Sequence, residues 1–143
     1  MRLWHKDLVF ALPREQLLGQ WRECCLIAKN IAEKGSPNHI LVNPIMNYDL
    51  VHFVSYCKWV ATCMERRGWK ADLGKIKKYL RKRRYWCNES LVELSDLFPG
   101  WHTRKYLTQC LANLEEKHDR GGISDDEWNV LMRHLSWVRR NAS

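Results

Sequence analysis

Apolar residues recur at helical spacing over most of the chain, and the runs are separated at glycine and proline. The first long run spans about residues 14–32, between Pro13, whose missing N–H costs nothing in a first turn, and Gly35. The second spans about residues 48–67 and ends at Gly68, a good C-terminal cap. Both patterns predict amphipathic helices. The residues expected on their buried faces are Leu17, Trp21, Cys24, Cys25 and Ala28 in the first, and Leu50, Phe53, Val54, Cys57, Val60, Ala61 and Met64 in the second.

Three more helical segments follow. A short basic helix is expected from about Asp72, and a longer one over about residues 103–117. The last begins at "SDDE", where Ser124 and Glu127 have the spacing of a capping box. The buried faces are expected to carry Tyr106, Leu107, Cys110, Leu111 and Leu114 in the longer helix, and Trp128, Leu131, Leu135 and Val138 in the last.

The remaining segments have weaker patterns. Residues 38–46 are expected to be extended or a loop, because Pro44 argues against a central strand. A short helix is expected at about residues 89–96. A length of 143 residues suits one domain with a real core. The sequence therefore predicts an all-α fold, a compact single domain of about five to six helices over residues 1–143, and nothing in it demands more than a monomer.

Charge and tryptophan content point towards a polyanion. The net charge is +8, and the chain has eight Trp, which can serve a core or a binding surface. The densest basic run covers residues 75–84, with Tyr79 inside it and Tyr85 and Trp86 directly after, so that an aromatic ring could stack on an exposed base. The alternatives are a solvated basic helix with its aromatics in the core, or an anionic membrane surface. The cations expected to reach phosphates are Lys75, Lys77, Lys78, Arg81, Lys82, Arg83 and Arg84.

Several classes of site are disfavoured. The six His form no H-E-x-x-H motif and no set with Cys at zinc spacing, so no metal site is expected. The chain has no G-x-S-x-G, no P-loop and no G-x-G-x-x-G, which disfavours the corresponding hydrolases and nucleotide-dependent enzymes. The six Cys form no C-x-x-C pair, and no signal peptide or apolar run of ~18 residues is found. We therefore expect reduced thiols and a cytoplasmic protein that does not enter a membrane.

Glu23 can be interpreted in two ways. On a helix it shares a face with Gln16, Gly19 and Gln20, and Gly19 would let another backbone approach closely. A helical Glu beside Arg22 is usually half of a surface ion pair. The other interpretation is the acid–base group of an active site, and residue type alone favours the ion pair.

Longer motifs change this balance. "MRLW" at the start, "LPREQLLGQWRE" at residues 12–23, "NHILV" at 38–42 and "YDLVHFVSYCKWVATCMERRGWKAD" at 48–72 occur in this order. Together they resemble the pyrimidine dimer DNA glycosylase family, the phage endonuclease V-like enzymes, over roughly residues 1–75. The resemblance implies an all-α fold, no metal and no cofactor. It also implies a bacterial cytoplasm or nucleoid, or a phage-encoded protein, as the setting.

The resemblance also implies the site residues. The family's nucleophile is the α-amino group of the first residue, here Met1, which is normally retained before a residue as large as Arg2. Its acid–base group is the Glu of an Arg-Glu pair on the first long helix, here Glu23 beside Arg22. An α-amine generally has a pKa of ~7.7–8.0, so a useful fraction is neutral and nucleophilic at cellular pH. Arg2, Arg14 and Arg22 join the run at 75–84 as expected phosphate contacts.

The expected function is therefore a DNA glycosylase with AP-lyase activity. Its partner would be double-stranded DNA with damaged bases or abasic sites, cut through a Schiff base and β-elimination. Three alternatives stay open: a non-catalytic nucleic-acid-binding helical domain, a glycosylase or lyase of the same fold for another lesion or for RNA, and a protein-interaction domain with an incidental basic face.

Overall fold

The computed structural model describes residues 1–83 and 90–141, and every regular element in this part of the chain is helical. Its five α-helices are α1 (Arg14–Lys34), α2 (Leu50–Arg66), α3 (Leu73–Arg81), α4 (Arg104–Asp119) and α5 (Asp125–Asn141). Three short 3₁₀ helices, η1 (Val9–Ala11), η2 (Asn43–Asn47) and η3 (Leu94–Asp96), lie in the connections. The predicted all-α fold class is confirmed.

Local signals in the sequence set the helix ends. α1 stops at Gly35, whose φ of 79° is a left-handed conformation that glycine adopts at little cost. Asp49 and Asp72 precede α2 and α3, and each side chain accepts from the backbone N–H two residues on. At the start of α5 the Ser124 hydroxyl accepts from the N–H of Glu127 at 3.1 Å and donates to its carboxylate at 3.3 Å. The serine half of the predicted capping box is therefore formed, while the second carboxylate oxygen of Glu127 accepts from the backbone N–H of Arg14 at 2.7 Å.

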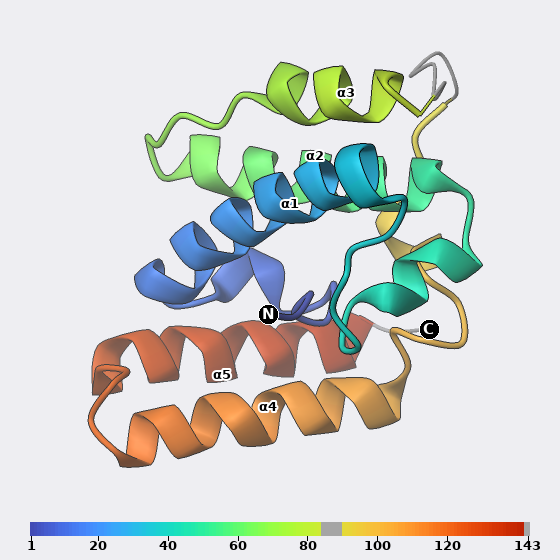
Figure 1. Cartoon of the computed structure of the whole chain (residues 1–143). Helices are drawn as coiled ribbons and strands as arrows, with labels where there is room; N and C mark the ends of the chain where they lie inside the picture. The colour runs from blue at the N-terminus through green and yellow to red at the C-terminus, as the bar shows by residue number, and fades with distance from the viewer. Residues whose placement is uncertain (84–89, 142–143) are drawn as a thin grey trace.

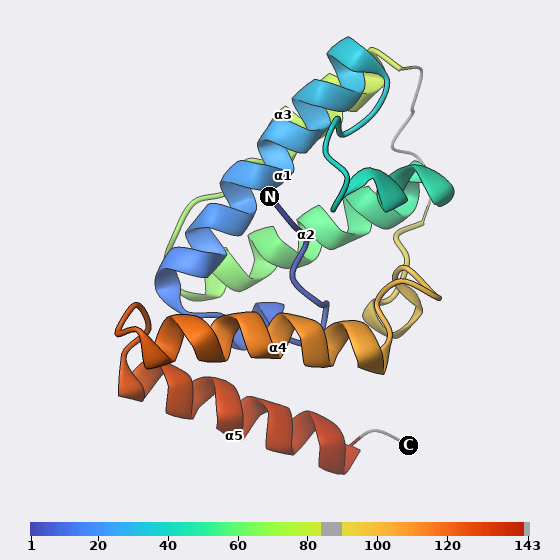
Figure 2. The same ribbon diagram turned by 60° about the horizontal axis from the view of Figure 1, so that its bottom comes forward.

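Two groups of helices lie on either side of the N-terminal segment. Figure 1 shows α4 and α5 as an antiparallel pair along one side of the molecule, and α1, α2 and α3 on the other. The chain starts next to α1, as Figure 2 also shows. One core joins buried side chains of both groups and of the N-terminal segment. Its largest fully buried side chains include Tyr56, Phe53, Phe98, Leu3, Leu8, Leu12, Leu17 and Ile27.

Two connections differ from the expectation. Residues 38–46 contain the start of η2, with Pro44 in its first turn, where proline loses no hydrogen bond. In the described part of residues 89–96 the expected helix is reduced to the single turn of η3. Tertiary contacts hold this segment instead. The N–H of Val92 donates to the hydroxyl of Ser55 at 2.8 Å, and the ammonium of Lys6 donates to the C=O of Ser95 at 2.9 Å.

The predicted core faces are largely buried, with exceptions at their edges. Trp21 and Cys25 are half-buried and pack against the margin of the core. Adjacent helical positions point about 100° apart, so Cys24 and Cys25 cannot both face its centre, and Cys24 is the buried one. Val138 is half-buried beside two surface clefts. The cysteines of the described residues are all free thiols, and no helix there is long and apolar enough to cross a membrane.

Candidate active site at the N-terminal amine

Gln20 on α1 holds the N-terminal segment by its backbone. Its Oε1 accepts from the N–H of Trp4 at 2.8 Å, and its Nε2 donates to the C=O of Arg2 at 3.0 Å. Gln20 is only 1% exposed, so water competes little for these bonds. One amide side chain thus satisfies two backbone groups that no neighbouring strand could pair.

Two tyrosines hold the same segment from other helices. The Tyr106 hydroxyl on α4 donates to the C=O of Leu3, and the Tyr56 hydroxyl on α2 donates to the C=O of Trp4, both at 2.6 Å. The Tyr56 hydroxyl also lies 3.1 Å from Oε1 of Gln20, which links α1 and α2 at this point. Burial raises the pKa of both phenols, most strongly that of Tyr56. Both therefore keep their protons, and remain donors, at any ordinary pH.

With the N-terminal segment held by these hydrogen bonds, the amine of Met1 lies beside Glu23. The amine nitrogen lies 4.0 Å from Oε1 of Glu23, and the N–H of Arg2 donates to Oε2 at 3.1 Å. Each carboxylate oxygen therefore faces a different nitrogen of the first two residues. The Met1 side chain is 14% exposed and that of Glu23 34% exposed, so a large ligand can approach them from solvent. A distance of 4.0 Å exceeds a hydrogen bond and leaves room for a group bound to the amine.

The surface one turn before Glu23 is open. A Cβ at Gly19 would meet only the guanidinium of Arg22, at 3.8 Å, so the second backbone expected to pack here is not found among the described residues. That expectation was wrong because the nearest polypeptide segment, residues 2–4, is held one position further along the helix by Gln20. Gly19 instead leaves space in front of the carboxylate, with the exposed Arg22 at its edge.

The two other arginines of the first 14 residues lie at different distances from the amine along the chain. Arg2 adjoins Met1, and its guanidinium carbon lies 4.9 Å from the ring centre of Trp4. Arg14 starts α1, about two and a half turns before Glu23, with its guanidinium 5.8 Å from the ring of Trp69. Arg2 and Arg22 are therefore the chain neighbours of Met1 and Glu23, whereas Arg14 lies at the start of α1.

The basic run of α3 lies on another side of α1. In both Figure 1 and Figure 2, α1 lies between α3 and the start of the chain. Ile76 and Leu80 anchor α3 in the core, which turns its cations outwards. Arg84 lies outside the described residues, as do Tyr85 and Trp86, while Tyr79 is half-buried with the ammonium of Lys82 5.6 Å from its ring centre. The exposed cations of this run are Lys75, Lys78, Arg81, Lys82 and Arg83, and Lys77 is half-buried.

Arg83 has a structural contact that the other cations of the run lack in the described structure. Its Nε donates to the C=O of Ile31 at 2.9 Å and lies 3.2 Å from that of Ala32, in the last turn of α1. The carbonyl of Ile31 also accepts from the N–H of Gly35 at 3.0 Å, and a guanidinium is suited to the negative end of a helix. Arg83 therefore caps α1, which favours a role in stability over one in DNA contact.

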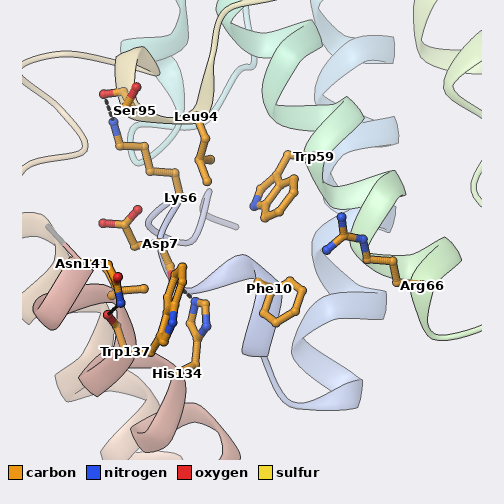
Figure 3. Close-up of a pocket in the computed structure, with 11 residues that line it drawn as sticks. Lys6, Asp7, Phe10, Trp59, Arg66, Leu94, Ser95, His134, Trp137 and Asn141 are labelled. Carbon is orange, nitrogen blue, oxygen red and sulfur yellow. Dashed lines mark hydrogen bonds between the residues drawn. The ribbon is translucent and has the colours of Figure 1, made fainter.

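A spacious cleft of the described structure lies at a different place. It measures about 960 Å³ and is lined by aromatic side chains of η1, α2 and α5, which Figure 3 shows around one space. Neither Met1 nor Glu23 lines it. The pairing of an amine with a carboxylate, rather than cleft size, therefore identifies the candidate active site. The aromatic side chains that line this cleft are Phe10, Trp59, His134 and Trp137.

Sequence reasoning missed the residues that hold the segment. Gln20 carried a usable signal, because it is a polar residue within the apolar stripe of Leu17, Cys24 and Ile27. Tyr56 and Tyr106 carried none, since a tyrosine on a buried face usually reads as core. No group of three or more His, Cys, Asp and Glu side chains that could hold a metal is found among the described residues.

A comparison with known families found a match that covers the N-terminal half of the chain. The family model of pyrimidine dimer DNA glycosylases matches residues 1–77, just over half of the chain, from Met1 through α1 and α2 into α3. No curated protein and no solved structure matches the chain. The matched part contains both the amine of Met1 and Glu23, and by this match the chain belongs to the pyrimidine dimer DNA glycosylase family, whose members act on damaged DNA.

Proposed function

We propose that this protein excises pyrimidine dimers or related base lesions from double-stranded DNA and then cuts the strand as an AP lyase. The observation that carries the proposal is the position of the Met1 amine, 4.0 Å from Oε1 of Glu23. Nucleophilic catalysis by an amine needs an adjacent group that can move protons, and Glu23 is the carboxylate in contact with it.

Met1 is the proposed nucleophile. Its neutral α-amine attacks C1′ of the damaged nucleotide, the C1′–N bond breaks, and the base leaves with the bonding electron pair. Opening of the sugar ring gives a Schiff base between the amine and C1′. The bonds from Gln20, Tyr56 and Tyr106 support this step, because they fix the peptide groups directly behind the amine.

Glu23 is the proposed proton shuttle. It takes the proton that the amine loses after its attack and, as a carboxylic acid, passes it to the ring oxygen as the sugar opens. As a carboxylate it then removes a proton from C2′, the C3′–O bond breaks, and the 3′ phosphate leaves on the downstream strand. Water hydrolyses the remaining imine and frees the amine. The Arg2 N–H on Oε2 supports this role, since it holds one oxygen and leaves Oε1 turned to the amine.

Access to C1′ requires distortion of the duplex. Displacing a nucleotide costs a few kcal/mol, and less at a lesion that already stacks poorly. The open surface at Gly19 and the exposed Arg22 support an approach of the DNA backbone at this point. Arg2 is the second proposed phosphate contact, and Arg14 and the exposed cations of α3 are more distant candidates.

The proposal is tested with a duplex that holds one cyclobutane pyrimidine dimer and a second that holds one abasic site. We expect Glu23→Gln to cut both of these duplexes about 10²–10⁴-fold more slowly than wild type. General acid–base catalysis is lost, while the amide oxygen can still accept from the N–H of Arg2. The matched control is Glu33→Gln, because Glu33 is an exposed glutamate of the same helix. Cleavage by Glu23→Gln at a rate similar to that of the control would contradict the proposed role.

A further inference from the structure

A second cleft, of about 530 Å³, lies at one end of the α4–α5 pair. Figure 1 shows that α4 begins where α5 ends, so the two helices contribute opposite ends to this cleft. Its volume is in the range of about 300–1,000 Å³ that is usual for ligand sites. The residues that matter for its chemistry are His5, Lys6, Asp7, His102, Arg104 and Arg139.

His102 offers this cleft an unused hydrogen-bond donor. Its Nδ1 accepts from the N–H of Lys6 at 3.0 Å, so the proton of the neutral ring is on Nε2. Burial lowers the pKa of His102 to about 2, which keeps the ring neutral and Nε2 a donor. The side chain is 6% exposed, and Nε2 is buried without a hydrogen-bond partner among the described residues. Buried donors are nearly always paired, so this one requires an acceptor.

The surroundings of His102 favour an anionic acceptor. Arg104 and Arg139 are exposed cations of the cleft, and Asp7 is the one carboxylate in its lining, while the ammonium of Lys6 is bound to the carbonyls of Ser95 and Leu97. Each half of the antiparallel pair supplies one of the two arginines.

The first turn of α4 adds backbone donors next to the cleft, because Arg104 belongs both to this turn and to the cleft lining. Thr103 caps that turn by accepting from the N–H of Tyr106, while the N–H groups of Arg104 and Lys105 have no preceding turn to bind. A helix start with free N–H groups is a favourable place for a phosphate.

We propose that this cleft binds a phosphate group, with Nε2 of His102, the guanidinium of Arg104 and the first N–H groups of α4 as donors. Nε2 is shielded from water in the free protein, so the flexible side chains at the rim must turn for a phosphate oxygen to reach it. His5 holds the ring from behind, stacked on it with centroids 5.3 Å apart.

A backbone phosphate of the DNA is the favoured source, and this part rests on the proposed function. His5 is four residues from Met1, so their Cα atoms are at most about 14 Å apart. Each DNA strand carries one phosphate per ~3.4 Å of axis, so this bound corresponds to about four base-pair steps between Met1 and His5, a residue of the cleft lining.

The first test titrates inorganic phosphate into the full chain and follows the His102 ring and the Arg104 and Lys105 amides by NMR. We expect saturable shifts at these three positions. His102→Asn keeps an acceptor for the Lys6 N–H but removes the Nε2 donor, and it should weaken phosphate binding about tenfold or more. Arg104→Gln, at an exposed position, should do the same without endangering the fold. Absence of saturable shifts in the wild type, or wild-type phosphate affinity in both variants, would overturn the proposal.

The second test assigns the source. Binding to a duplex with a non-cleavable abasic analogue is measured over a range of salt concentrations. For a DNA phosphate, Arg104→Gln should lower the slope of log Kd against log[salt] by about 1, while Lys105→Gln, an adjacent exposed cation outside the cleft, should change it less. Equal slopes in wild type and Arg104→Gln would overturn the DNA source and leave free phosphate as the ligand.

The two proposals fail separately. Formation of a Schiff base at Met1 without phosphate binding would reject the cleft alone. Phosphate binding without a Schiff base would reject the lyase chemistry alone.

Discussion

Replacing Gln20 with Met tests whether the position of the amine matters for the chemistry. The substitution keeps the length and approximate volume of the side chain, but it removes both backbone hydrogen bonds of the amide. The N–H of Trp4 and the C=O of Arg2, bound at 2.8 and 3.0 Å, are left without their partner. Tyr56 still holds the C=O of Trp4, so the segment is loosened rather than released.

The loss of stability can be estimated from these groups. A buried donor left unpaired costs about 1–3 kcal/mol, and the partly buried carbonyl of Arg2 costs less. The free energy of unfolding should therefore fall by about 2–4 kcal/mol. Domains of this kind have roughly 5–15 kcal/mol in total, so the variant should still fold. Urea unfolding measures the change, and faster amide exchange at Trp4 shows that it is local.

The same variant should lose activity beyond its loss of stability. A displacement of about 1 Å at a reacting group can cost on the order of 10²-fold in rate. We expect the single-turnover rate of Schiff-base formation on an abasic duplex to fall about 10–100-fold per folded molecule. Ser55→Ala is the matched control, because Ser55 is a buried polar residue of α2 whose hydroxyl binds the N–H of Val92 and not the N-terminal segment. Ser55→Ala should have a lower free energy of unfolding than wild type but the same rate of Schiff-base formation.

A Gln20→Met protein that loses stability but forms the Schiff base as fast as Ser55→Ala would refute the reasoning. Gln20 would then be a structural residue whose hydrogen bonds do not position the amine.

Two more predictions concern stability. Burial lowers the folded-state pKa of His102 to about 2, below the usual 6.5. Below pH 6.5 the unfolded chain therefore binds a proton at this residue that the folded chain does not. As the pH falls to 5, this difference lowers the free energy of unfolding by about 2 kcal/mol. Urea unfolding between pH 8 and 5 should show this fall in the wild type and a smaller fall in His102→Asn. An equal dependence of the free energy of unfolding on pH in the two proteins would contradict the prediction. Separately, Arg83→Gln should lower the free energy of unfolding by about 0.5–1 kcal/mol through loss of the cap on Ile31, while Lys78→Gln should not change it. Equal thermal shifts in the two would contradict the capping role.

The sequence was sufficient for the helices because each had a periodic apolar face and a local end signal. Gly35, Asp49, Asp72 and Ser124 stand where helices stop or start in the structure. The sequence was insufficient for the segment around η3, because the conformation of this segment depends on a lysine about 90 residues away in the chain. No local pattern shows that the ammonium of Lys6 will bind the carbonyls of Ser95 and Leu97.

The candidate site likewise contains residues that the sequence could identify and residues that it could not. Met1 and Glu23 were identified from their resemblance to a family motif, and the fold places them together. The residues that hold them there come from α1, α2 and α4, and a contact between Leu3 and Tyr106 spans 103 positions. Such contacts depend on tertiary packing, which periodicity within one helix does not describe. The charge of α3 was likewise visible, but not that α1 lies between it and the amine.

The most direct test of the central claim is to trap the Schiff base and locate it. Untagged protein that starts at Met1 is mixed with a duplex holding one abasic site, reduced with borohydride, digested and mapped by mass spectrometry, with N-terminally acetylated protein beside it. The account predicts a covalent adduct on the α-nitrogen of Met1 that acetylation abolishes. An adduct on a lysine would contradict the role of Met1, and DNA binding without any adduct would contradict the lyase chemistry and favour the binding-only alternative.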